Sequence, residues 1–125
     1  MRLLLDSNAL IWAYSRPAEL AAIARRHLGD PDNERLVSVA SLWEISIKMS
    51  IGKLSFAEEF DRVLDDLAVT LLPVTVAHVE AIQTLPFHHR DPFDRMLVAQ
   101  ALAEGLTIVT RDRRFAAYDV PVLAA

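Results

Sequence analysis

The stretch Leu3-Leu4-Leu5-Asp6-Ser7-Asn8-Ala9-Leu10-Ile11-Trp12 decides the fold class of this 125-residue chain. Its three leucines predict a short buried strand, and the polar residues that follow them predict a turn that opens a helix. Short apolar strands that lead directly into helices are typical of a parallel sheet covered on both faces. We therefore expect an α/β domain that begins with a strand and a helix.

The alternation of strands and helices continues along the whole chain. Further strands are predicted at residues 36–39, 69–74 and 106–110, with an edge strand at 120–123. Helices are predicted at residues 9–13, 17–28, 41 to about 52, 56–67, 76–85 and 92–104. We expect one domain over residues 1–125, with a mostly parallel central sheet flanked by helices.

Composition narrows the class of protein. Without cysteine and with 53% hydrophobic residues, the chain is expected to fold around its own core without disulfides. It contains no apolar run of the roughly 20 residues that a membrane span requires, so we expect a cytoplasmic protein with no membrane partner. The formal net charge of -4, taken at face value, disfavours a nucleic-acid binder.

Four acidic residues stand at junctions between the predicted elements. Asp6 follows the first strand and Asp112 follows the strand at 106–110, while Asp94 and Glu44 lie near the starts of two helices. In an open α/β sheet, ligands bind beyond the carboxyl ends of the strands, which is where these acids are expected to gather.

Each acid also has a purely structural interpretation. Asp6 and Asp112 are suited to capping the turns that follow them, and Asp91-Pro92 is a good helix start that leaves Asp94 in the first turn. Ser41 and Glu44 have the spacing of a capping box. These interpretations are compatible with a site, because helix N-termini converge on the same edge of the sheet.

Four gathered carboxylates would repel one another and require a cation. Two unit charges about 4 Å apart interact by about 4 kcal/mol at an effective dielectric constant near 20. Oxygen ligands favour Mg²⁺, with Mn²⁺ as a substitute, and such an ion suits phosphodiester hydrolysis.

Four segments of the chain, in order, resemble the motifs of the PIN-domain ribonucleases, and within that group the VapC toxins of toxin–antitoxin modules. The segments are Leu4-Leu5-Asp6-Ser7-Asn8-Ala9-Leu10-Ile11-Trp12, Ser38-x-x-Ser41-Leu42-Trp43-Glu44-Ile45, Asp91-Pro92-Phe93-Asp94-Arg95-Met96-Leu97-x-Ala99-Gln100-Ala101 and Ile108-Val109-Thr110-Arg111-Asp112. The resemblance spans nearly the whole chain, and the third segment is its most specific part.

This resemblance implies a PIN-like fold and a Mg²⁺-dependent endoribonuclease toxin that hydrolyses RNA phosphodiester bonds. It implies a homodimer, and a cognate antitoxin whose C-terminal segment covers the acidic site. The acidic quartet of the family, which is catalytic and binds metal, maps onto Asp6, Glu44, Asp94 and Asp112. Asn8 stands where close relatives often carry histidine, and Arg111 stands where a smaller residue is usual, so substrate preference is the property these two departures affect.

Several other residues are candidates for roles around the quartet. Ser7 and Thr110 are expected to orient a carboxylate or a water molecule. Contacts with RNA are expected from Asn8, Arg90, Arg95, Arg111 and Arg113, with Arg114 in the same arginine cluster. His88 and His89 are interpreted as exposed loop residues rather than ligands, and Trp12 and Trp43 as core or interface residues.

The alternative to an enzyme is a catalytically silent PIN-like interaction module whose junction acids only cap helices. It predicts no metal binding. The charge balance is compatible with the enzyme, because the quartet accounts for four of the 17 acids and the remaining 13 equal the 13 Lys and Arg residues. The surplus negative charge would then be the metal site itself.

Overall fold

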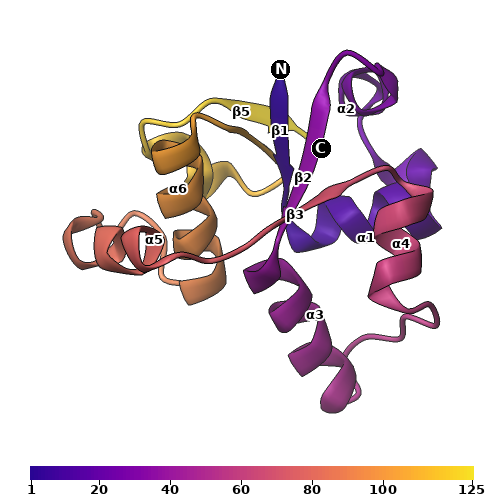
Figure 1. Ribbon diagram of the computed structural model, residues 1–125, viewed down its shortest axis with the longest axis horizontal. Helices are drawn as coiled ribbons and strands as arrows, with labels where there is room; N and C mark the ends of the chain where they lie inside the picture. The colour runs from indigo at the N-terminus through magenta and orange to yellow at the C-terminus, as the bar shows by residue number, and fades with distance from the viewer.

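The computed structural model describes residues 1–125 and contains a five-stranded sheet with helices on both faces (Figure 1). All neighbouring strands are parallel, in the order β3-β2-β1-β4-β5. The strands are β1 (Arg2–Leu5), β2 (Glu34–Ser38), β3 (Thr70–Leu72), β4 (Thr107–Thr110) and β5 (Val122–Ala124). The expected α/β architecture is confirmed, and the sheet is wholly rather than mostly parallel.

Six α-helices connect the strands, and none of them has the length and apolar composition needed to cross a membrane. They are α1 (Ser7–Ser15), α2 (Ala22–Gly29), α3 (Val39–Ser50), α4 (Phe60–Asp66), α5 (Val76–Ala81) and α6 (Pro92–Glu104). The helix expected from Pro17 is instead a 3₁₀ turn followed by α2, because Leu20 between them is extended. The helix expected from Phe56 begins at Phe60, since Phe56 lies in a preceding loop and packs its ring into the core.

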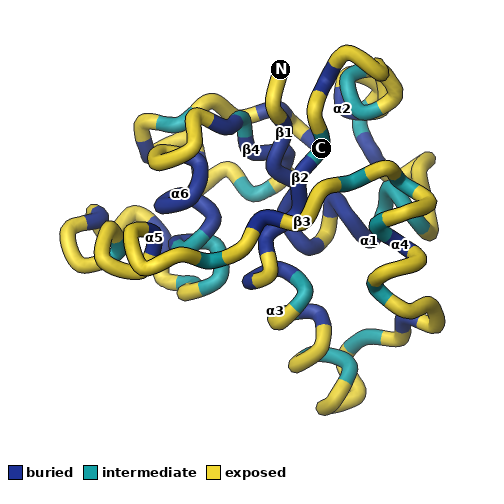
Figure 2. Tube along the Cα trace, in the orientation of Figure 1, coloured by how far each residue is buried: buried dark blue, intermediate teal, exposed yellow.

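Two hydrophobic cores lie on opposite faces of the sheet. Along β1, Leu3 and Leu5 point to one core while Leu4 points to the other, as successive side chains of a strand must. The first core is covered by α1, α2, α3 and α4, and the second is covered mainly by α6. Figure 2 shows that β1, β2 and β4 are buried along most of their length.

The strand order reverses between β1 and β4. The chain runs outward from β1 through β2 to β3, then returns across the sheet to β4 on the other side of β1. At such a reversal the connections leave a crevice beyond the carboxyl ends of the two strands. Asp6 follows β1 and Asp112 lies two residues beyond β4, so the fold brings both to this crevice.

Candidate functional site

Asp6 is held at the carboxyl end of β1 by two hydrogen bonds to its side chain. Oδ1 accepts from the backbone N–H of Ala9 at 2.8 Å, which caps α1, and Oδ2 accepts from Oγ1 of Thr110 at 2.6 Å. Burial raises the pKa of Asp6, the two hydrogen bonds lower it, and the negative charges of Glu44 and Asp112 raise it further. Asp6 is therefore a helix cap and a member of an acidic cluster at once.

Glu44 lies in the middle of α3, and both of its oxygens have partners. Oε1 accepts from Oγ of Ser7 at 2.5 Å, and Oε2 lies 3.2 Å from Nζ of Lys48. The predicted capping box of Ser41 and Glu44 is wrong, because α3 begins earlier and Ser38 caps it by accepting from the N–H of Ala40. Glu44 therefore does not cap the helix, and its side chain lines the same pocket as the other three acids.

Asp94 lies in the first turn of α6. Asp91 caps this helix by accepting from the N–H groups of residues 93 and 94. Burial raises the pKa of Asp94 to about 8, and the negative charges of Asp91, Glu44, Asp6 and Asp112 contribute in the same direction. Without a cation, Asp94 therefore retains a proton at neutral pH.

Asp112 caps the 3₁₀ turn Arg113–Ala117 and remains strongly acidic. Its two oxygens accept from the guanidinium of Arg114 at 2.8 to 3.2 Å, and Oδ1 also accepts from the backbone N–H of Arg114. These hydrogen bonds hold the pKa of Asp112 well below its usual range, and a bond from His89 lowers it further. Asp94 and Asp112 thus lie in one cluster but differ in their protonation.

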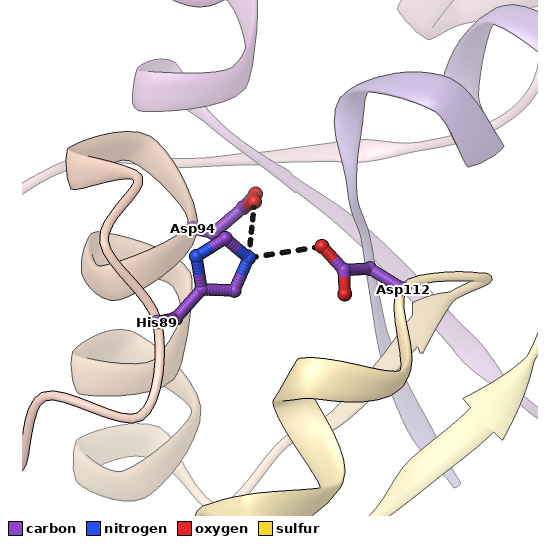
Figure 3. Close-up of side chains that lie close together, drawn as sticks. All are labelled: His89, Asp94 and Asp112. Atoms are coloured by element: carbon purple, nitrogen blue, oxygen red, sulfur yellow. Dashed lines mark hydrogen bonds and ion pairs between the residues drawn. The ribbon is translucent and has the colours of Figure 1, made fainter.

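His89 contradicts the prediction of an exposed loop residue. Its side chain is fully buried, and Nε2 lies 2.9 Å from Oδ2 of Asp112 and 3.0 Å from Oδ2 of Asp94 (Figure 3). His88, by contrast, is exposed as predicted, with its ring edge against Tyr118. The sequence carries little signal for this difference, because the two histidines are adjacent in an irregular loop and only the folded chain turns one of them inward.

The four candidate carboxylates line one polar pocket of about 220 Å³, which no hydrophobic residue lines. Its ten lining residues are Asp6, Ser7, Asn8, Glu44, Lys48, Asp91, Asp94, Arg111, Asp112 and Arg114. Their donor set is mostly carboxylate oxygen, and burial and mutual repulsion raise the pKa of two of the acids. These properties fit a hard divalent cation such as Mg²⁺ or Mn²⁺.

The cationic side chains near the polar pocket differ in whether they line it and in what they contact. Arg111 lines the pocket, and its guanidinium lies 4.1 Å from the ring centroid of Trp12 and donates to the carbonyls of Ala125 and Glu19. Arg90 and Arg113 are exposed and do not line it. Arg114, through its contacts with Asp112, and Lys48 are the cations that reach the acids.

The prediction that Arg95 contacts RNA is wrong. It is buried, and its guanidinium donates to the carbonyls of Pro86 and Leu85 at 2.9 and 3.2 Å while covering the ring of Phe87 at 4.0 Å. These contacts fix the loop that precedes α6. The arginine points away from solvent, because carbonyl groups of the loop accept its hydrogen bonds inside the protein.

An apolar cleft of about 440 Å³ is lined in part by α3 and the start of α6, the helices that carry Glu44 and Asp94. It is lined by Val39, Ala40, Trp43, Val74, Val79, Ile82, Pro92, Phe93 and Met96. Trp43 is 63% exposed, with its ring 5.1 Å from that of Phe93, and Val79 is 51% exposed. Trp43 is therefore a surface residue rather than part of the core, whereas Trp12 packs against the first core.

Comparison with known proteins agrees with this architecture. A family model of the PIN domain matches residues 3–121, so the chain belongs to the PIN domain family. It is 28% identical over 126 residues to "Ribonuclease VapC22" of Mycobacterium tuberculosis (strain ATCC 25618 / H37Rv), covering 94% of this chain and 92% of that protein. The resemblance inferred from the four sequence motifs is confirmed.

Solved structures share the fold at low sequence identity. VapBC2 from Rickettsia felis, crystallised with a DNA fragment from its promoter, matches with a TM-score of 0.74 at 16% identity over 98% of each chain. FitAcB from Neisseria gonorrhoeae matches with a TM-score of 0.64 at 20% identity, over 98% of this chain and 96% of that one. A toxin–antitoxin complex from Klebsiella pneumoniae is also similar, with a TM-score of 0.63 at 19% identity over 98% and 96%.

Proposed function

We propose that this protein is a Mg²⁺-dependent endoribonuclease that acts as the toxin of a toxin–antitoxin pair. The observation that carries the proposal is the convergence of Asp6, Glu44, Asp94 and Asp112, from four separate segments, in one polar pocket at the reversal of the sheet. The PIN family membership and the name of the VapC22 relative support a ribonuclease.

The four carboxylates would hold the Mg²⁺ ion, with Mn²⁺ as a substitute. When bound, the ion supplies an activated water and offsets the charge that develops on the scissile phosphate. Asp94 holds a proton in the metal-free protein near neutral pH and gives it up when positive charge enters the cluster. Thr110 and Ser7 keep Asp6 and Glu44 in place through hydrogen bonds of 2.6 and 2.5 Å.

RNA would approach over the exposed rim of the polar pocket. Asn8 and Arg111 line this rim and are suited to contact phosphate oxygens, as are Lys48 and Arg114. Arg90 and Arg113 would contact the RNA backbone farther from the reacting phosphate, because they are exposed but lie outside the pocket. The net negative charge of the chain then poses no obstacle, since the ion and local arginines meet the phosphates.

The apolar cleft is the surface we assign to the antitoxin. Several structural neighbours are named as VapBC or toxin–antitoxin complexes. An exposed tryptophan, Trp43, together with Val79 and Phe93, provides apolar area of the kind that anchors a partner segment. A segment seated there would lie next to the acidic pocket and restrict access to it. We also propose a homodimer, which light scattering of the purified protein tests.

The decisive experiment measures RNA cleavage by the purified protein with Mg²⁺, with EDTA, and with the variants Asp6→Asn and Asp94→Asn. The proposal predicts cleavage that EDTA and both variants abolish. Val79→Thr, which keeps shape on a surface outside the pocket, serves as the control for purification and should cleave like the wild type. Activity that survives EDTA or both Asn variants contradicts the proposal.

The competing possibility is a catalytically silent interaction module whose acids serve only as caps. Asp6 and Asp112 do cap helical turns, which favours this reading in part. It predicts no cleavage and no binding of Mn²⁺ in a calorimetric titration. The raised pKa values of Asp6 and Asp94 favour the enzyme, because capping alone gives no reason to place four acids within each other's fields.

A further inference from the structure

The imidazole of His89 is buried and is held by ring packing and by hydrogen bonds at both nitrogens. Its ring contacts Phe115 edge-on, with ring centroids 5.5 Å apart, and its backbone N–H donates to Oη of Tyr118 at 3.0 Å. The side chain has no exposed surface. The ring therefore has one orientation, and it points Nε2 at the acidic cluster (Figure 3).

A backbone contact determines which nitrogen of this ring carries the proton. Nδ1 of His89 lies 3.1 Å from the backbone N–H of Asp91 and accepts its hydrogen bond. A nitrogen that accepts a hydrogen bond is unprotonated, so the proton of the neutral ring is on Nε2. The Nε2–H group faces Oδ2 of Asp112 at 2.9 Å and lies 3.0 Å from Oδ2 of Asp94.

We propose that His89 is a positioning residue of the metal site, in its Nε2–H tautomer, and not a metal ligand. Its single Nε2–H group donates to Asp112, in the turn after β4, and lies 3.0 Å from Oδ2 of Asp94, on α6. The ring therefore stands between two carboxylates that arrive from different segments. This inference rests on the proposed function, since it assigns a role at the same site.

The arrangement disfavours direct coordination by His89, although its Nε2 and one oxygen of each aspartate lie within 4.8 Å of one another. Coordination requires an unprotonated nitrogen, and moving the proton to Nδ1 would turn a donor toward the N–H of Asp91. The hydrogen bond to Asp112 would also be lost. Oδ1 of Asp94 accepts no hydrogen bond and stays available to a cation, so the histidine orients the cluster without using up its ligands.

Two variants of His89 test the roles of its two ring nitrogens separately. In His89→Gln the side-chain amide nitrogen reaches the place of Nε2 and can still donate to Asp112. In His89→Asn the shorter side chain can accept from the N–H of Asp91 but brings no donor to the carboxylates. His88→Asn, at the exposed neighbour, is the matched control.

The first readout is the affinity of the RNA-free protein for Mn²⁺, measured by calorimetry. Loss of a partner that orients a metal ligand typically weakens binding about 10-fold or more, which is the effect expected for His89→Asn. His89→Gln should recover most of the affinity, and His88→Asn should leave it unchanged. An unchanged affinity in His89→Asn, or equal weakening in His89→Gln, overturns the positioning role. Wild-type protein that binds no Mn²⁺ overturns the proposed function instead.

The second readout needs no variant and holds even if His89→Asn fails to fold. Nitrogen-15 NMR of the imidazole distinguishes the tautomers, and we expect the Nε2–H form of His89 both without and with saturating Mg²⁺. An Nδ1–H form in the presence of Mg²⁺, or loss of the Nε2 proton, would show coordination and overturn the proposal.

Discussion

The polar pocket and the apolar cleft share two helices, α3 and the first turn of α6. On α3, Trp43 lines the cleft and Glu44 lines the pocket, and on α6 Phe93 lines the cleft and Asp94 lines the pocket. Consecutive residues of a helix project about 100° apart, so one residue of each pair faces the cleft and the next faces the pocket. Under the proposed function, catalysis and partner binding therefore depend on separate side chains that are adjacent in sequence.

The largest expected effect comes from removing one charge from the polar pocket. Asp6→Asn keeps a side chain that caps α1 about as well as aspartate, so it isolates the charge from the cap. Cleavage of RNA should fall by roughly 100-fold or more, because a cation ligand is lost.

The free energy of unfolding of the metal-free Asp6→Asn variant shows whether the charge of Asp6 is also needed for folding. Burial and the neighbouring acids disfavour the ionised form of Asp6, so removing it should leave the free energy of unfolding equal or higher. A variant that loses both activity and stability would mean that Asp6 serves mainly as a structural residue.

A charge placed in the apolar cleft should weaken antitoxin binding and leave RNA cleavage intact. Val79→Glu adds a carboxylate to an exposed position of α5, and an unpaired charge buried under a partner is costly. We expect binding of the antitoxin, sought as the protein encoded by the adjacent reading frame, to weaken roughly 30-fold, which is about 2 kcal/mol. Cleavage of RNA should be unchanged. Equal loss of both activities would break the separation of the two surfaces.

The stability of the protein and its affinity for metal should depend on pH through the polar pocket, because the pocket and not the cleft contains acids with raised pKa values. Asp94 has a pKa of about 8 in the folded protein, against its ordinary value of 3.8. Between these values the folded state holds a proton that the unfolded state has released, so the stability of the metal-free protein falls as pH rises from 4 to 8.

If Asp94 binds the cation as proposed, binding of Mn²⁺ requires this proton to leave Asp94. The affinity should therefore rise by up to about 10-fold per pH unit between pH 6 and 8, and level off above. Calorimetry at several pH values measures the affinity for Mn²⁺. Unfolding of the metal-free protein at the same pH values measures its stability, and Asp94→Asn is the control for that profile. An affinity that does not change over this range would contradict the assignment of Asp94 to the cation.

The smallest effect concerns the hydroxyl that supports Glu44. Ser7→Ala removes a 2.5 Å hydrogen bond to Oε1 but leaves Lys48 on the other oxygen. A lost hydrogen bond of this kind costs about 1 kcal/mol, so cleavage should fall roughly 5-fold. Kinetics at saturating Mg²⁺ test this, and antitoxin binding should not change.

Local patterns along the chain were sufficient to predict most of the fold. The leucine run of β1 and the run at residues 106–110 indicated parallel strands because they are buried on both faces. The acids at the element junctions indicated the site because parallel strands end at one edge of the sheet. The wholly parallel sheet and the start of α4 at Phe60 required the folded chain.

Residues that depend on long loops were not predictable in this way. His89 and Arg95 are polar residues near a helix start, where exposure is the ordinary expectation, yet both are buried. Their partners are 23 residues away at Asp112 and within the preceding loop at Pro86. No periodicity encodes how an irregular loop folds back, so only the three-dimensional arrangement shows that His89 contacts two acids and that Arg95 donates to backbone carbonyls.

Anomalous diffraction from crystals of the protein soaked with Mn²⁺ tests whether the four carboxylates bind a divalent cation. We expect a single region of Mn²⁺ density in the polar pocket, coordinated by oxygens of the Asp6, Glu44, Asp94 and Asp112 cluster, with Nε2 of His89 still bonded to carboxylate rather than to the ion. Mn²⁺ bound elsewhere, or no ion in a pocket with ordered carboxylates, would contradict it.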